Sequence, residues 1–253
     1  MVASCDPEVR EALLAAALAT LESARAAGLA VDPVTIRERT ADESEWRDVW
    51  KQFFRATRVG RSFTVRPSWD PWQARDGELV IDLDPGRAFG TGAHPSTRLA
   101  VGLAEDWRDG RTDVRRFLDL GCGSGILAIA AAHLWPEANG LAVDNDPEAV
   151  ACSRENFARN RVRSVALATG SLDRAEGVFD VILANLQADV LGALAPAMAA
   201  KVAPGGCAIL SGILPEQVDE VLAAYTDAGL APARRRDEGE WAALLLRPAR
   251  LAG

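Results

Sequence analysis

The chain has 253 residues, of which 49% are hydrophobic and 25% are charged, and its formal net charge at pH 7 is -8. This composition is typical of a globular protein with a sizeable core, and no apolar run approaches the roughly 18 residues of a membrane span. The opening MVASCDPEVRE lacks the basic start and apolar run of a secretory signal, so we expect a cytoplasmic protein with no membrane partner. The negative charge argues against direct nucleic-acid binding, because that affinity comes from basic side chains.

Four cysteines are spread along the chain, at Cys5, Cys122, Cys152 and Cys207, and none of them forms a C-x-x-C pair. This spacing indicates neither a zinc site nor a disulfide framework. We therefore expect buried reduced thiols and no metal.

The first third of the chain predicts a small α+β unit. Its first helix has Asp6 at the N-cap, Pro7 in the first turn and Gly28 after its end. The expected elements are helices over residues 6–28 and 42–54 and strands over residues 31–36, 58–69 and 78–83. The last two strands are expected to pair across the turn PSWDPW. We therefore divide the chain into residues 1–84 and residues 85–253.

The stretch KQFFRATRVGRSFTVR, residues 51–66, contains five cations and no acid. One interpretation is a contact with RNA. The other, which we favour, is that its phenylalanines pack inward and its arginines face water.

The loop AFGTGAHPSTR, residues 88–98, combines glycines, a proline and three hydroxyls. The glycines allow a close approach of the backbone to a ligand. Ser96 and Thr97 fall in the first turn of a helix that starts at Pro95, where free N–H groups and the helix dipole favour an anion. His94 can either cap this helix or accept a proton, and we favour the cap.

The helix that starts at Pro95 is expected to end near Trp107. Glu105 and Asp106 lie near its end and are interpreted as solvated.

From residue 110 onwards, strands and helices alternate, and the strands are continuously apolar, as in FDVILAN. Such runs are typical of strands buried on both faces of a parallel sheet, so the sequence predicts a doubly wound, mostly parallel α/β domain. The basic run at residues 234–236 is interpreted as a solvated turn before the last strand. The expected strands lie near residues 115–120, 140–144, 164–168, 178–184, 206–211 and 241–247.

The segment FLDLGCGSGILAIAAA reads as a strand, a glycine turn and a helix, an order that places backbone N–H groups beside a nucleotide cofactor. Gly121 and Gly123 leave room for the ligand. Asp144 ends the next apolar strand, where an acid accepts hydrogen bonds from ribose hydroxyls. The spacing G-x-G-x-G differs from the dinucleotide pattern G-x-G-x-x-G. With Asp119 before it, LDLGCGSG resembles motif I of the class I S-adenosylmethionine methyltransferases; a nicotinamide-dependent dehydrogenase remains the alternative.

The segment ILANL, residues 182–186, ends another buried strand in Asn185, at the carboxyl edge where open α/β sheets bind ligands. It could simply cap the next helix, because asparagine is a good N-cap. Its placement on the same edge as Gly121 and Asp144 instead resembles the asparagine of amino-methyltransferases, whose amide and neighbouring carbonyl hold an amine.

Five segments together resemble the PrmA-type methyltransferases that modify ribosomal protein L11: FGTGAHPST, LDLGCGSGILAIAA, AVDNDPEAV, ANL and LSGIL. The resemblance begins near residue 45 and continues to the C-terminus. It implies a seven-stranded, Rossmann-like class I methyltransferase domain in residues 85–253 and a substrate-recognition or linker region in residues 1–84. The region before WRDVW is about half the length that the family leads us to expect.

The resemblance also implies the site. The family's cofactor contacts fall on Thr97, Gly121, Asp144 and Asn185, with Gly123 in the same turn, and Asn185 is the expected catalytic residue. The expected cofactor is S-adenosylmethionine and the expected reaction is methylation of lysine ε-amino groups, α-amino groups or both on L11. The alternatives are another protein or small-molecule amine as acceptor, and a protein that binds the cofactor without turnover.

Overall fold

The structure is a computed structural model that describes residues 55–84, 92 and 94–249. The elements expected over residues 6–28, 31–36 and 42–54 lie outside this part of the chain. The described residues fall within one compact unit, Asp48–Gly253. The boundary at residue 84 stays a prediction.

The larger sheet confirms the predicted doubly wound, mostly parallel architecture with seven strands. Its spatial order is β6-β5-β4-β7-β8-β10-β9, with parallel pairing from β6 to β8 and antiparallel pairing of β10 with β8 and β9. The strands are β4 (Arg116–Leu120), β5 (Asn139–Asp144), β6 (Val165–Thr169), β7 (Phe179–Asn185), β8 (Val202–Ile213), β9 (Leu230–Glu238) and β10 (Trp241–Pro248).

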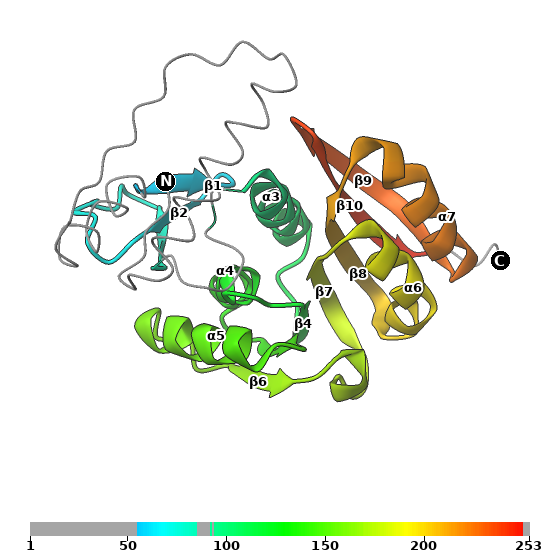
Figure 1. Ribbon diagram of the computed structural model, residues 1–253, viewed down its shortest axis with the longest axis horizontal. Helices are drawn as coiled ribbons and strands as arrows, with labels where there is room; N and C mark the ends of the chain where they lie inside the picture. Colours follow the sequence, from blue (N-terminus) through cyan, green and yellow to red (C-terminus); the bar gives the residue numbers. More distant parts are fainter. Residues whose placement is uncertain (1–54, 85–91, 93, 250–253) are drawn as a thin grey trace, which may run out of the picture. The chain divides into compact units, whose positions relative to one another are not determined.

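Helices cover both faces of this sheet, with α3, α4 and α5 on one face and α6 and α7 on the other (Figure 1). Successive residues of a strand therefore enter different cores: Val181 of β7 packs with the first group and Ile182 with the second. Burial on both faces explains the continuous apolar runs in the sequence. The helices are α3 (Pro95–Gly110), α4 (Ile126–Leu134), α5 (Pro147–Arg159), α6 (Ala188–Ala199) and α7 (Val218–Asp227), with short 3-10 turns η2 (Leu172–Arg174) and η3 (Pro215–Gln217).

A second sheet contains β1 (Thr57–Val59), β2 (Phe63–Arg66) and β3 (Leu79–Asp82). The strand predicted over residues 58–69 is interrupted by a turn at Gly60, and β1 and β2 pair antiparallel. The expected pairing with the next strand is present, but β2 and β3 are parallel. A parallel pair needs a crossover of about a dozen residues, which residues 67–78 supply.

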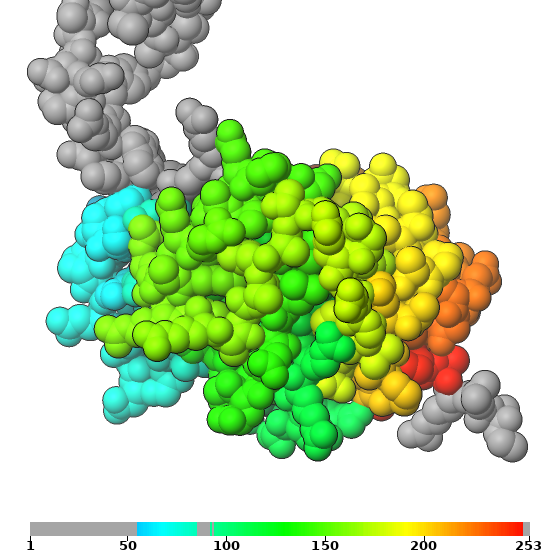
Figure 2. Space-filling view, turned by 90° about the horizontal axis from the view of Figure 1, so that it is seen from below, coloured from blue at the N-terminus to red at the C-terminus, as the bar shows by residue number. Residues whose placement is uncertain are grey.

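This small sheet packs against the larger domain. Phe63 is fully buried in the core that α3 and α4 share, as the packing interpretation of residues 51–66 predicts for this phenylalanine. Asn160, after α5, accepts a hydrogen bond from the Asp82 backbone at 2.8 Å and donates one back at 2.7 Å. In the space-filling view the small sheet (cyan) and α7 (orange) lie on opposite sides of the green central elements (Figure 2).

The interpretation of residues 234–236 as a turn is wrong, because they form the middle of strand β9. This strand pairs only with β10 and lies at the sheet edge. Residues 232–235 are all exposed, so the strand lacks the apolar run that reveals a central strand.

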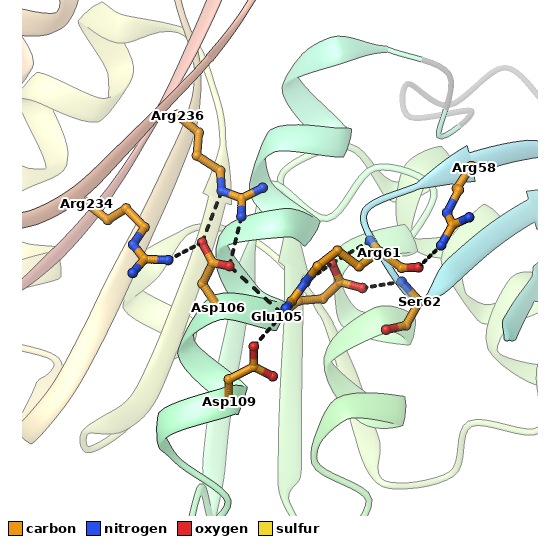
Figure 3. A network of polar contacts seen from close by, with 8 residues as sticks. All are labelled: Arg58, Arg61, Ser62, Glu105, Asp106, Asp109, Arg234 and Arg236. Atoms are coloured by element: carbon orange, nitrogen blue, oxygen red, sulfur yellow. Dashed lines mark hydrogen bonds and ion pairs between the residues drawn. The ribbon is translucent and has the colours of Figure 1, made fainter. Parts of the chain in front are cut away.

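The interpretation of Glu105 and Asp106 as solvated is also wrong. The Glu105 side chain is 2% exposed, and its two oxygens accept hydrogen bonds from the backbone N–H groups of Arg61 and Ser62, each at 2.7 Å (Figure 3). Buried carboxylates need such partners because they lose their hydration. Glu105 thereby fixes the turn between β1 and β2 to α3.

Asp106 ties the other side of α3 to the edge strand β9. Its side chain is 8% exposed and forms ion pairs with Arg234 at 2.7 Å and Arg236 at 2.8 Å (Figure 3). Both arginines lie in a strand far from Asp106 in the chain, so the sequence around Asp106 gives no sign of the pairing. The two acids together hold α3 between the small sheet and β9.

No helix in the described part of the chain is long and apolar enough to span a membrane.

We expect Glu105→Gln to lower the free energy of unfolding by about 1–3 kcal/mol, because the amide NH2 group would face a backbone N–H and leave a buried donor unsatisfied. Urea unfolding measures this difference. The matched control is Asp109→Asn, since Asp109 also pairs with Arg61 but is 57% exposed, and its loss should cost less than about 1 kcal/mol. Equal effects of the two substitutions would contradict the role of Glu105.

Candidate active site

A cavity of about 260 Å³ opens where the parallel strands of the larger sheet end. All five predicted site residues line it: Thr97, Gly121, Gly123, Asp144 and Asn185. They come from four separate segments of the sequence. The structure thus brings together the residues that the sequence analysis singled out, and their individual roles remain predictions.

The glycine turn after β4 forms one wall of this cavity. Gly121 has a φ of 72°, in the left-handed region, and a Cβ added there would lie 2.4 Å from Cδ2 of Leu186. Its N–H donates to the carbonyl oxygen of Val143 at 2.8 Å, which fixes the turn to β5. Any larger residue at position 121 would be strained and would displace the opposite wall.

Asp144, the last residue of β5, faces this turn. Its Oδ2 accepts a hydrogen bond from the Gly123 N–H at 2.8 Å, and its Oδ1 accepts one from the Asp146 N–H at 3.0 Å. A carboxylate oxygen can accept more than one hydrogen bond, so both oxygens retain capacity for a ligand. The carboxylate is held in place before any ligand arrives.

Asn185, the last residue of β7, reaches across the cavity to α3. Its Nδ2 lies 3.4 Å from Oγ1 of Thr97, which is fully buried. Asn185 does not cap the next helix, because the N-cap of α6 is Gln187. The capping alternative is therefore wrong for this asparagine.

His94 acts as a helix cap, in agreement with the favoured interpretation. Its Nδ1 accepts a hydrogen bond from the Ser96 N–H at 3.3 Å, and its ring packs edge-on against Trp241 at a centroid distance of 4.7 Å. Burial, followed by the positive charge of Arg98, lowers the pKa of His94. A neutral imidazole suits the role of acceptor at this cap. The second histidine, His133, is half-buried and packs near Phe63.

Ser211 does not line the cavity but supports its wall, a role that the sequence analysis missed. It is fully buried, and its hydroxyl donates to the carbonyl oxygen of Ser96 at 2.7 Å. The signal was present in LSGIL, where a serine and a glycine end an apolar strand at the same sheet edge as Asn185. The contact links β8 to the first turn of α3, next to Thr97.

Asp119 lies beneath the glycine turn and is 1% exposed. Its Oδ2 accepts a hydrogen bond from the Ala128 N–H at 2.8 Å, and its Oδ1 has no hydrogen-bond partner among the described residues. Burial, and to a smaller extent the charge of Asp144, raises the pKa of Asp119 to about 7. Sequence reasoning used this acid only to recognise the motif and gave it no structural role.

The described cysteines agree with the expectation of reduced thiols: Cys122 and Cys207 are buried, Cys152 is partly buried, and all three are free. Burial raises the pKa of Cys122 to about 12, so its thiol stays protonated near neutral pH. Cys5 lies outside the described residues. The described part of the chain contains no cluster of side chains suited to a metal ion.

Comparison with known proteins points to one family. A family model described as ribosomal protein L11 methyltransferase (PrmA) matches residues 9–248. A ribosomal protein L11 methyltransferase from Geobacter metallireducens is 44% identical over 240 residues, which cover 95% of this chain and 78% of the relative.

Solved structures of methyltransferases are also similar to this chain. The crystal structure of a ribosomal protein L11 methylase from Lactobacillus delbrueckii subsp. bulgaricus matches with a TM-score of 0.71 and 31% identity, covering 78% of this chain and all of that one. An S-adenosylmethionine-dependent methyltransferase from Clostridium acetobutylicum matches with a TM-score of 0.53 and 14% identity, covering 62% of this chain and 93% of that one. The second likeness concerns the fold alone.

The raised pKa of Asp119 gives a pH test. The folded protein holds this proton up to about pH 7, whereas the ordinary pKa of the group in an unfolded chain is 3.8, so rising pH destabilises the wild type between these values. An asparagine amide cannot titrate. As the pH rises through this range, the free energy of unfolding of Asp119→Asn should therefore increase relative to that of wild type by about 1.4 kcal/mol per pH unit.

Urea unfolding of both proteins at several pH values between 4 and 8 measures the change, with the exposed Asp173→Asn as a surface control. A difference between Asp119→Asn and wild type that stays constant with pH would show that folding leaves the pKa of Asp119 unchanged, contrary to this expectation.

Proposed function

Because the chain belongs to the ribosomal protein L11 methyltransferase family, we propose that it transfers methyl groups from S-adenosylmethionine to amino groups of ribosomal protein L11. The acceptors are lysine ε-amino groups, α-amino groups or both. The observation that carries the proposal is the convergence of Thr97, the glycine turn, Asp144 and Asn185 on one cavity. These four segments are far apart in the sequence and meet only in the folded chain.

The residues of the cavity suit the cofactor. Gly121 and Gly123 line the cavity without side chains, and Asp144 presents carboxylate oxygens suited to ribose hydroxyls. The N–H groups of Ser96 and Thr97 already donate to His94, so α3 offers the methionyl carboxylate the Thr97 hydroxyl and the positive end of the helix dipole. We assign cofactor binding to Thr97, Gly121, Gly123 and Asp144, with Asn185 at the reacting end.

S-Adenosylmethionine supplies an activated methyl group on its sulfonium. The protein must hold an amine in its neutral form and in line, because an ammonium has no free electron pair. The side-chain oxygen of Asn185 and the adjacent Leu186 carbonyl oxygen are uncharged acceptors for the amine N–H groups. Orientation of this kind accounts for several kcal/mol in well-positioned reactions.

The direct test incubates the protein with labelled S-adenosylmethionine and ribosomal proteins. We expect one labelled band, L11, and we expect Asn185→Ala to slow transfer on the order of 100-fold, the effect of removing one oriented polar group from an active site. Cofactor affinity, measured by calorimetry, should stay within a few-fold of wild type.

Asn139→Ala is the matched control, because Asn139 is an exposed asparagine at the opposite end of β5. Label on another protein or on a small amine would establish the alternative acceptor with the same chemistry. Absence of any transfer while the cofactor binds would contradict the proposal and favour a binding protein.

Thr97→Val tests the cofactor end of the site. The substitution keeps the shape of the buried side chain but removes its hydroxyl, so we expect S-adenosylmethionine affinity to fall about fivefold or more, the equivalent of one hydrogen bond. Calorimetry measures this, with the exposed Thr226→Val in α7 as control. Wild-type affinity in Thr97→Val would remove Thr97 from the site, and tighter binding of a nicotinamide dinucleotide than of S-adenosylmethionine would favour the dehydrogenase alternative.

A further inference from the structure

Gly212, near the end of β8, faces the two oxygens that the proposed reaction uses. It has a φ of +83°, and a Cβ added there would lie 2.6 Å from the Leu186 carbonyl oxygen and 2.9 Å from Oδ1 of Asn185. Real Cβ atoms essentially never approach other atoms to less than 3.0 Å. A side chain at residue 212 would therefore press against both oxygens.

Two contacts of Ser211 fix the backbone just before Gly212. The Leu186 N–H donates to the Ser211 carbonyl oxygen at 3.1 Å, and the Ser211 hydroxyl donates to Ser96 at 2.7 Å. The Leu186 N–H bond to β8 thus fixes the peptide that precedes the Leu186 carbonyl and limits how far this carbonyl can move. Asn185 could move only by rotating its amide, which would disturb its contact with Thr97.

We propose that Gly212 is a positioning residue: because it has no side chain, the Asn185 and Leu186 oxygens keep the directions in which both accept hydrogen bonds from the methyl-accepting amine. This inference rests on the proposed function, because it concerns the site for the acceptor amine. Gly212 forms no bond to the substrate. It acts through the direction of the two oxygens.

An alanine at position 212 separates this role from cofactor binding. Its methyl group would lie between the two oxygens, so Asn185 would have to turn its amide. The cofactor contacts proposed for Gly121, Gly123 and Asp144 lie on other strands and would remain. We therefore expect loss of amine recognition with retention of cofactor affinity.

Backbone strain must be controlled, because any side chain at a φ of +83° is unfavourable. Gly229, in the turn before β9, has a φ of +90°, and a Cβ added there meets no atom within 4 Å. Gly229→Ala therefore introduces comparable strain without a contact. The comparison isolates the effect of the two oxygens from that of the backbone.

The test uses calorimetry of the full chain with two cofactor analogues. S-Adenosylhomocysteine lacks the transferred methyl, and sinefungin carries an amine in its place, which can donate to the Asn185 and Leu186 oxygens. We expect the wild type and Gly229→Ala to bind sinefungin about tenfold more tightly, the equivalent of one charge-assisted hydrogen bond. In Gly212→Ala this preference should fall to about twofold or less, while S-adenosylhomocysteine affinity stays within about threefold of wild type.

Asn185→Ala is a second variant for the same measurement, since it removes the side-chain oxygen of Asn185 without adding any atom. It should lose most of the same preference, and the double variant Asn185→Ala/Gly212→Ala should lose little more, because both changes act on one interaction. Retention of the full preference in Gly212→Ala or in Asn185→Ala would overturn the inference. So would a Gly212→Ala protein that fails to fold or loses affinity for both analogues alike, because Gly212 would then be a general structural residue.

These measurements need no acceptor protein. Wild type that shows the sinefungin preference but leaves L11 unlabelled would contradict L11 as the substrate and support the amine site. Wild type that labels L11 but binds the two analogues equally would contradict the amine site alone.

Discussion

The parallel register of four neighbouring strands determines where the site can form. Leu120 of β4 is paired with Val143 of β5 and with Ala184 of β7, and Ala184 is paired with Leu210 of β8. The residue that follows each of these in the chain lines the cavity or supports its wall: Gly121, Asp144, Asn185 and Ser211. One row of backbone pairing therefore aligns four chain segments at the same edge, and a shift of one residue in any strand would turn its site residue to the other face.

Helix α3 supplies the part of the site that the sheet cannot supply. In its first turn, the Thr97 hydroxyl accepts a hydrogen bond from the Asn185 amide, and the Ser96 carbonyl oxygen accepts one from the Ser211 hydroxyl. Farther along the helix, Glu105 binds the turn of the small sheet and Asp106 binds two arginines of β9 (Figure 3). Because the helix is fixed on both flanks, the position of its N-terminus relative to the sheet edge does not depend on a ligand.

The sequence could predict the parts of the fold that depend on local pattern and on sheet topology. Asp144 and Asn185 could be placed at one edge, because both follow buried strands of a parallel sheet. The roles of Glu105 and Asp106 could not be predicted, because their partners lie at least 43 residues away in the chain, in a turn and in an edge strand. Strand β9 was missed for a related reason: its exposed side carries arginines that resemble a solvated turn until Asp106 is placed beside them.

The chemistry of an amine acceptor also accounts for the presence of an amide at position 185 in place of an acid. A carboxylate beside the acceptor would favour the charged ammonium, since a nearby opposite charge raises the pKa of an amine. That would remove the electron pair that attacks the methyl group, and a lysine amine with a reference pKa of about 10.4 is already mostly protonated near neutral pH. The oxygens of Asn185 and Leu186 orient N–H groups without adding a full negative charge. Of the two acids near this site, Asp144 accepts a hydrogen bond from the glycine turn, and burial raises the pKa of Asp119 to about 7.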